Sequence, residues 1–153
     1  MSNAMTYFAG TTYPALGAGM VTTPDQYLLF LRKMFLGELL PRRLHDAMET
    51  DQYPAALRSA GDDGWHYGFT SWLECPRGVT EWGPACRALR VHSSAGAGGF
   101  RPQLNRELGY YIQVAYYGVP AVGSQITRTL VDEIRPLIAA ILRGAADERG
   151  VSA

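Results

Sequence analysis

The residues of this 153-residue chain that could do chemistry are two cysteines and a short histidine-serine stretch. Cys75 and Cys86 flank a turn-rich segment, so they could form a disulfide or remain two free, partly buried thiols. Two such ligands with no histidine near them in the sequence fall short of the four that a structural zinc site needs, so no metal site is expected. His92-Ser93-Ser94, taken alone, is more typical of a solvent-facing strand than of a site.

The remaining candidates have simpler interpretations. His45 and His66 have no partner at catalytic or metal-ligand spacing and are expected to be surface or satisfied histidines. Asp62-Asp63 is expected to form a turn, since no further calcium ligands accompany it. The glycines within residues 96–99 do not form a phosphate loop, because no Lys-Ser/Thr pair follows them. No cofactor is expected.

Charge and hydropathy exclude several kinds of partner. The chain has 14 Lys and Arg against 14 Asp and Glu, a formal net charge of +0, and no run of basic residues longer than two. Neither nucleic acid nor an anionic membrane surface is therefore an expected partner. The most apolar stretches, residues 27–35 and 137–142, are too short to span a bilayer.

Helical signals come first along the chain. Thr23, Pro24 and Gln26 form a capping box with a first-turn proline, and apolar residues follow at helical spacing. Gly37 can end this helix in the left-handed conformation. Residues 41–50 predict a second, short helix.

The middle of the chain predicts strands. Residues 65–74 alternate with period two, residues 88–94 can return antiparallel to them, and residues 110–117 are β-branched and aromatic. A long amphipathic helix from Ser124 to Gly144 follows. The order predicts an α+β fold, with an antiparallel sheet of about three strands packed by the C-terminal helix and two helices N-terminal to it.

One domain is expected, because the length suits a single hydrophobic core. We assign it to residues 5–144, with a polar tail at residues 145–153 and an expression scar at residues 1–4. Three strands leave open sheet edges, and an open edge favours pairing with another chain.

Four segments can be compared with known motifs: Gly17 to Thr23 with the helix after it, Tyr67-Gly68-Phe69 with Trp72, Val91 to Pro102, and Asn105 to Tyr110. In this order they resemble segments of the serine hydrolases of the β-lactamase and penicillin-binding-protein family, in particular the class C β-lactamase-related esterases. With the C-terminal helix they cover nearly the whole chain. The resemblance implies a partial β-lactamase/transpeptidase-like fold.

The chemistry of that family uses Ser-x-x-Lys, Tyr-x-Asn or Ser-x-Asn, and Lys-Thr-Gly or a relative such as His-x-Gly. The single lysine, Lys33, follows Phe30 by three residues, so Ser-x-x-Lys is absent, and no Tyr-x-Asn or Ser-x-Asn occurs after Met5. The resemblance therefore implies the C-terminal part of a serine hydrolase without its nucleophile, which is not catalytic as this chain.

The third motif is present as His92-Ser93-Ser94. The resemblance implies that His92 replaces the lysine beside a substrate carboxylate or carbonyl group, that Ser93 donates a hydroxyl, and that the Ala95 N–H is one arm of an oxyanion hole. Ser94 replaces the family's glycine. Together with the histidine it favours an esterase-like or amidase-like member over one that takes penicillins.

The expected partners follow from this incomplete site. A missing N-terminal half would complete it, and only then would a small ester, amide or β-lactam-like substrate bind. The alternative is a non-catalytic interaction module that dimerises or docks a partner chain through the open sheet edge. The expected location is cytoplasmic if Met5 is the true start, and periplasmic or secreted if a signal-bearing N-terminal half is missing.

Overall fold

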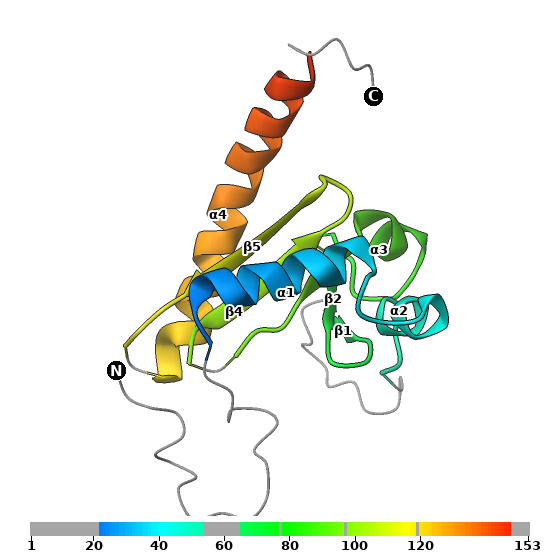
Figure 1. Cartoon of the computed structure of the whole chain (residues 1–153), viewed down its shortest axis with the longest axis horizontal. Helices are drawn as coiled ribbons and strands as arrows, with labels where there is room; N and C mark the ends of the chain where they lie inside the picture. The colour runs from blue at the N-terminus through cyan, green and yellow to red at the C-terminus, as the bar shows by residue number, and fades with distance from the viewer. Residues whose placement is uncertain (1–21, 54–64, 77, 97, 119, 148–153) are drawn as a thin grey trace, which may run out of the picture.

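The chain is described by a computed structural model at residues 22–53, 65–76, 78–96, 98–118 and 120–147 (Figure 1). Its elements are, in order, α1 (Pro24–Leu36), α2 (Arg42–Met48), β1 (Trp65–Tyr67), β2 (Trp72–Glu74), α3 (Pro84–Leu89), β3 (Val91–Ser93), β4 (Phe100–Asn105), β5 (Tyr110–Ala115) and α4 (Pro120–Asp147). No helix within these ranges has both the length and the apolar character needed to cross a membrane.

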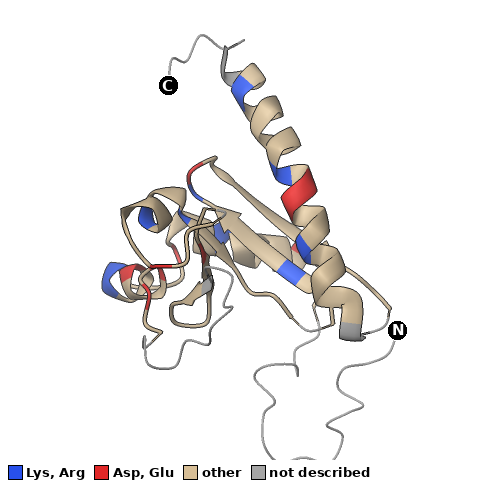
Figure 2. Ribbon diagram, turned by 180° about the vertical axis from the view of Figure 1, so that it is seen from behind, with Lys and Arg blue, Asp and Glu red and all other residues tan. Residues whose placement is uncertain are grey.

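The five strands form one open antiparallel sheet in which each strand pairs with the next along the chain. α1 and α4 pack on opposite faces of β4 and β5, as the front and back views show (Figures 1 and 2). Side chains alternate along a strand, so the register divides them between an α1 face and an α4 face. The prediction of an α+β fold with N-terminal helices and a long C-terminal helix is confirmed.

α1 forms where its local signals predict it. The Gln26 N–H donates to Thr23 Oγ1 at 3.3 Å, and the Thr23 N–H donates to the Gln26 side chain at 3.5 Å, which completes the capping box. Gly37 ends the helix with a φ of 72°. The ring of Phe35 lies 5.9 Å from the ring of Tyr111, so this contact packs the helix against β5.

The prediction of three strands is wrong, and residues 65–74 provide one reason. They form a hairpin rather than one strand, and the Gly68 N–H donates to the Ser71 carbonyl oxygen at 2.9 Å across its turn. Thr70 takes a φ of 63°, which helps to reverse the chain. A Cβ on Gly68 would lie 1.9 Å from the Met48 carbonyl oxygen, so this close approach requires glycine. The period-two alternation of residues 65–74 does not reveal this contact with Met48, so it predicts one continuous strand.

β4 is the other strand that the sequence did not predict. It contains Pro102 and Asn105, residue types that are depleted in strands, together with the polar Arg101 and Gln103, yet all four are buried. Its polar side chains lie on the α4 face, where they find partners in place of water. A pattern that assigns polar residues to solvent therefore misses the strand.

Element boundaries also differ from the prediction. α3 occupies part of the segment expected to be a connection, so β3 is shorter than the strand expected at residues 88–94. α4 begins at Pro120, before the expected cap at Ser124, and continues past Gly144 to Asp147. Residues 145–147 thus extend the helix, although a polar tail was expected from 145 onward.

Hydrogen bonds as well as apolar contacts join α4 to the sheet. The Glu74 carboxylate on β2 accepts from Gln103 Nε2 at 3.0 Å and pairs with Arg135 of α4. Burial lowers the pKa of Arg135, but the charge and hydrogen bond of Glu74 outweigh this effect, so the pKa is raised overall. The guanidinium of Arg101, whose residue is only 2% exposed, donates to the Ser124 carbonyl oxygen at 3.5 Å. These partners make the burial of a polar strand tolerable.

On the α1 face, Arg106 ties the β4–β5 turn to the first two helices. Its guanidinium donates to the carbonyl oxygens of Met34, at 3.1 Å, and Phe35 at the end of α1. It also pairs with the Glu49 carboxylate just after α2. Arg106 Cζ lies 5.2 Å from the centroid of the Phe35 ring, which is a cation–π contact. A cation here complements the negative end of the α1 dipole.

Replacing Arg106 with alanine should lower the free energy of unfolding by about 3 kcal/mol, because it leaves the partly buried Glu49 without its cation. Arg106→Lys should recover only part of this loss, since an ammonium cannot reproduce the planar set of donors. Urea unfolding followed by tryptophan fluorescence measures both variants. The control is Arg42→Ala, because Arg42 is 94% exposed and should contribute little through its pair with Asp46. Equal losses for Arg42 and Arg106 variants would contradict the assignment.

Candidate substrate-binding site

The predicted stretch His92 to Ala95 covers the end of β3 and the two residues after it. His92 and Ser93 are 6% and 3% exposed, whereas Ser94 is exposed. His92 pairs with Leu104 of β4 and shares the α1 face with it. Ser93 pairs with Gln103 and shares the α4 face with it. The stretch stays together in space, but its side chains are divided between the two faces of the sheet.

A pocket of about 240 Å³ lies on the α1 face beside this stretch. His92, Ser93 and Ser94 contribute to its lining, and Ala95 does not. The facing wall comes from α1 and consists of Tyr27, Phe30, Leu31 and Met34. Two polar residues, Thr70 and Ser71, come from the β1–β2 turn. A small, mainly apolar ligand would suit this lining.

His92 is neutral at neutral pH. Burial lowers its pKa from 6.5 to about 4. The carboxylate of Glu49, 3.7 Å from Nε2, acts in the opposite direction, while Arg106, His45 and Arg90 add to the lowering. The imidazole therefore brings no positive charge to the pocket, and it can serve only as a neutral hydrogen-bonding group.

The expected role of Ser93 does not suit its placement. Its Oγ is buried and has no hydrogen-bond partner in the described part of the chain. Because the register turns this side chain toward the α4 face, Ser93 can reach the pocket only through its main chain. Its hydroxyl is therefore not a donor to a ligand in the pocket.

Ser94 and Ala95 are better placed as donors. The N–H groups of Ser94 and Gly96 both donate to carbonyl oxygens of β4, at 3.2 and 2.8 Å. We expect the intervening N–H of Ala95 to point away from β4, since successive N–H groups alternate in direction along an extended chain. The exposed Ser94 hydroxyl lies on the pocket side by the same alternation.

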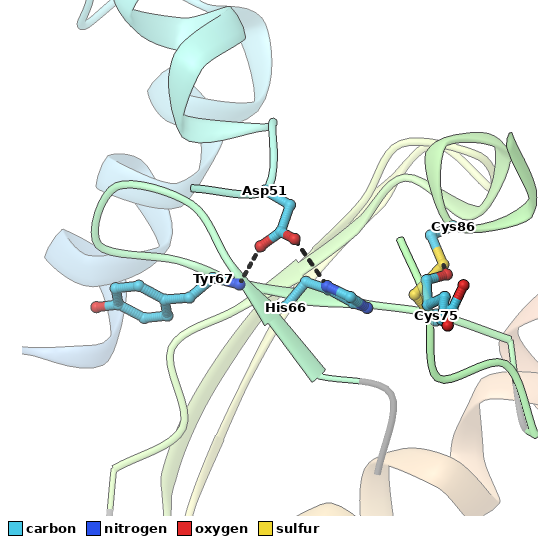
Figure 3. The surroundings of a disulfide bond; sticks show 6 residues. Asp51, His66, Tyr67, Cys75 and Cys86 are labelled. Carbon is cyan, nitrogen blue, oxygen red and sulfur yellow. Dashed lines mark hydrogen bonds and ion pairs between the residues drawn. A yellow bond between two sulfur atoms is a disulfide. The ribbon is translucent and has the colours of Figure 1, made fainter. Parts of the chain in front are cut away.

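A second polar cluster lies beside the disulfide of the structure (Figure 3). His66 is fully buried, and its Nδ1 lies 2.9 Å from Asp51 Oδ2. Asp51 Oδ1 accepts from the N–H groups of Tyr53 and Tyr67, at 3.1 and 3.2 Å. Burial raises the pKa of Asp51, but the hydrogen bonds from His66 and these two N–H groups outweigh it, so the pKa is lowered overall. Asp51 therefore stays a carboxylate that orients the His66 ring.

The disulfide joins Cys75, just after β2, to Cys86 on α3. Both sulfur atoms and one ring nitrogen of His66 lie within 4.8 Å of one another. The sequence indicated no partner for His66. Its contacts come from Asp51, in the segment after α2, and from Cys86, on α3. No spacing rule connects these segments. Asp62-Asp63 lies outside the described residues.

The sequence did not connect three further residues with His92: Glu49, Arg106 and the partly buried His45. Arg106 donates to His45 Nε2, which lies 3.4 Å from Glu49. Only the four-residue spacing of His45 and Glu49 was a local signal, and it indicates a shared helix face rather than a site. The contact with Arg106 forms only when the β4–β5 turn meets α1 and α2.

The segments that resemble β-lactamase-like hydrolases fall on α1, on the β1–β2 hairpin, on β3 to β4 and on the β4–β5 turn, while Gly17 to Val21 lies outside the described residues. No family model, curated protein or solved structure matches the chain. The resemblance therefore rests on the residues of this chain alone, and the fold stands as an α+β fold with an open five-stranded sheet.

Acid should destabilise the protein through His92. The unfolded chain binds a proton at this residue below a pH of about 6.5, whereas the folded chain does so only near a pH of about 4. Stability is therefore present above the unfolded pKa and is lost as the pH falls between these values, by between about 2 and 3 kcal/mol. Urea unfolding at pH 7.5 and 4.5 measures the loss. His92→Gln should remove this part of the pH dependence, and an unchanged dependence in that variant would contradict the assignment.

Proposed function

We propose that this chain is the substrate-binding part of a serine hydrolase related to β-lactamases and penicillin-binding proteins, with a partial β-lactamase/transpeptidase-like fold. One observation carries the proposal. The His92-Ser93-Ser94 stretch, which resembles the family's third motif, lines a pocket large enough for a small acyl group. We assign one arm of an oxyanion hole to the Ala95 N–H, because its neighbours Ser94 and Gly96 both donate to β4 and the alternation of N–H groups directs the intervening one away from β4.

The charge of the pocket favours neutral substrates. His92 is neutral, because burial lowers its pKa to about 4, and the facing wall is apolar. A substrate carboxylate would lose its hydration without gaining a cation beside it. A small neutral ester or amide therefore fits better than a penicillin-type carboxylate.

Among the residues that the structure describes, we identify no serine activated by a base. Ser-x-x-Lys is absent from the 153 residues. Ser93 is buried on the far face, and within the described ranges no hydrogen bond joins either serine of the stretch to His92. An unassisted serine hydroxyl is a weak nucleophile at neutral pH. The pocket is thus proposed to bind and not to cleave.

The expected result is binding without turnover. Nitrophenyl butyrate and a chromogenic cephalosporin should be hydrolysed no faster than in buffer, while the butyrate ester should shift the amide NMR signals of Ser94 and Ala95 with a dissociation constant of about 1 mM, typical of so small a ligand. Ser94→Phe should block the pocket and abolish these shifts. Thr129→Phe, on the exposed surface of α4, is the matched control. Turnover that Ser93→Ala abolishes, or shifts that Ser94→Phe leaves intact, would overturn the proposal.

A second function, from a different class, is an interaction module that forms a homodimer. Apolar side chains on one side of α4 are 41% to 69% exposed: Val122, Ile126, Leu130, Leu137 and Ile141. Both views show this helix extending beyond the end of the sheet (Figures 1 and 2). β5 is the last strand in the order, so its outer edge is open among the described residues. An exposed apolar stripe and an open sheet edge are each typical of an association surface.

Light scattering tests the dimer. The chain should have the mass of a dimer at micromolar concentration, and Ile141→Glu should convert it to a monomer by placing a charge in the apolar stripe. Gln125→Glu adds the same charge on another side of α4 and should leave the dimer intact. A monomeric unmodified chain would exclude this second function.

A further inference from the structure

His66 directs a buried, unused nitrogen toward two cysteines. Nδ1 is occupied by Asp51, so in the neutral ring Nε2 carries a lone pair. Nε2 is fully buried and has no hydrogen-bond partner in the described part of the chain. Figure 3 shows the ring with this nitrogen on the side of the disulfide. A buried nitrogen without a partner is destabilising, so a ligand that this nitrogen can bind would relieve the cost.

The ligand atoms have nearly the separation that one metal ion requires. Cys75 Sγ, Cys86 Sγ and a nitrogen of His66 lie within 4.8 Å of one another. Ligands held at about 2.0 to 2.3 Å from a tetrahedral zinc ion lie roughly 3.5 to 3.8 Å apart. Once the sulfur-sulfur bond is broken, small side-chain movements would therefore complete the geometry.

We propose that reduction of the Cys75–Cys86 disulfide creates a zinc site formed by Cys75, Cys86 and His66. Asp51 is the positioning residue, because metal-bound histidines commonly donate their other ring N–H to a carboxylate. The proposal does not rest on the proposed substrate pocket. It also alters the expectation from sequence, in which the cysteines had no histidine near them.

The chemistry balances with a dithiol as the reductant. The dithiol gives two electrons and two protons to the Cys75–Cys86 disulfide, which becomes two thiols, and the dithiol becomes a disulfide. Zinc then binds both sulfurs and His66 Nε2 and displaces the two thiol protons to solvent. The Glu81 carbonyl oxygen, 3.3 Å from Cys86 Sγ, can accept a hydrogen bond from the Cys86 thiol before zinc arrives.

Open space lies on the Cys86 side of the proposed site. Cys86 lines a second pocket of about 240 Å³ together with Trp82 and Arg87. Three protein ligands leave a tetrahedral zinc ion one open position, which water commonly fills. Zinc would also replace the disulfide as the link between β2 and α3, so the link would persist under reducing conditions.

Metal titration of the full 153-residue chain tests the proposal. The chain is reduced with a phosphine, which takes oxygen from water to become a phosphine oxide and leaves no competing thiol. The reduced chain should bind one Zn²⁺ and release two protons, and with Co²⁺ it should show sulfur-to-cobalt charge-transfer absorption. The oxidised chain, which has the same sequence, should bind no Zn²⁺ at the same concentrations. A reduced chain that binds no zinc, folded or not, would overturn the proposal, and so would equal binding by both forms.

Variants assign the ligands. Cys75→Ser, Cys86→Ser and His66→Ala should each abolish stoichiometric binding, while Asp51→Asn should weaken it by roughly 10- to 100-fold. His45→Gln is the matched control and should leave zinc binding unchanged, since His45 contacts Arg106 instead. Full binding by His66→Ala, or by either serine variant, would show that the ion is held elsewhere.

Discussion

The guanidinium of Arg106 connects the β4–β5 turn to α1 and to the segment after α2, both of which are far from this turn in the sequence. From the β4–β5 turn it reaches the last carbonyl oxygens of α1 and the Glu49 carboxylate after α2. These bonds hold α1 across β4 and β5, where its apolar side chains form one wall of the pocket. The same charge helps to keep His92 neutral. One cation thus contributes to both the shape and the electrostatics of the proposed binding site.

The two faces of the sheet are stabilised by different means. The α1 face combines apolar helix contacts with the Arg106 cluster, and it leaves a pocket. On the α4 face, Glu74 joins Gln103 of β4 to Arg135 of α4. Buried ion pairs of this kind contribute less to net stability than to the specificity of packing. This network, with the hydrogen bond from Arg101 to the Ser124 carbonyl oxygen, explains how a strand with buried Arg101 and Gln103 can lie inside the sheet.

The short strands at the other end of the sheet depend on long-range links. β1 and β2 have three residues each, so they bury little apolar surface. Asp51 bonds to His66 and to the Tyr67 N–H, which fastens the segment after α2 to β1. The disulfide fastens β2 to α3. A zinc ion at the same cysteines would retain the second link after reduction, which gives the proposed metal site a structural role as well as a chemical one.

Local signals were sufficient for α1 and α2, and for the presence of β5 and α4, because capping and apolar periodicity act within a few residues. His92 to Ala95 also lie together as expected, since these residues are adjacent in the chain. The tertiary structure decided which face each side chain occupies, because strand register depends on the neighbouring strands. Only the tertiary structure shows that residues 65–74 form a hairpin and that the polar side chains of β4 are buried. The contacts of His66 and Arg106 join segments that no sequence period relates, so only the folded chain could bring them together.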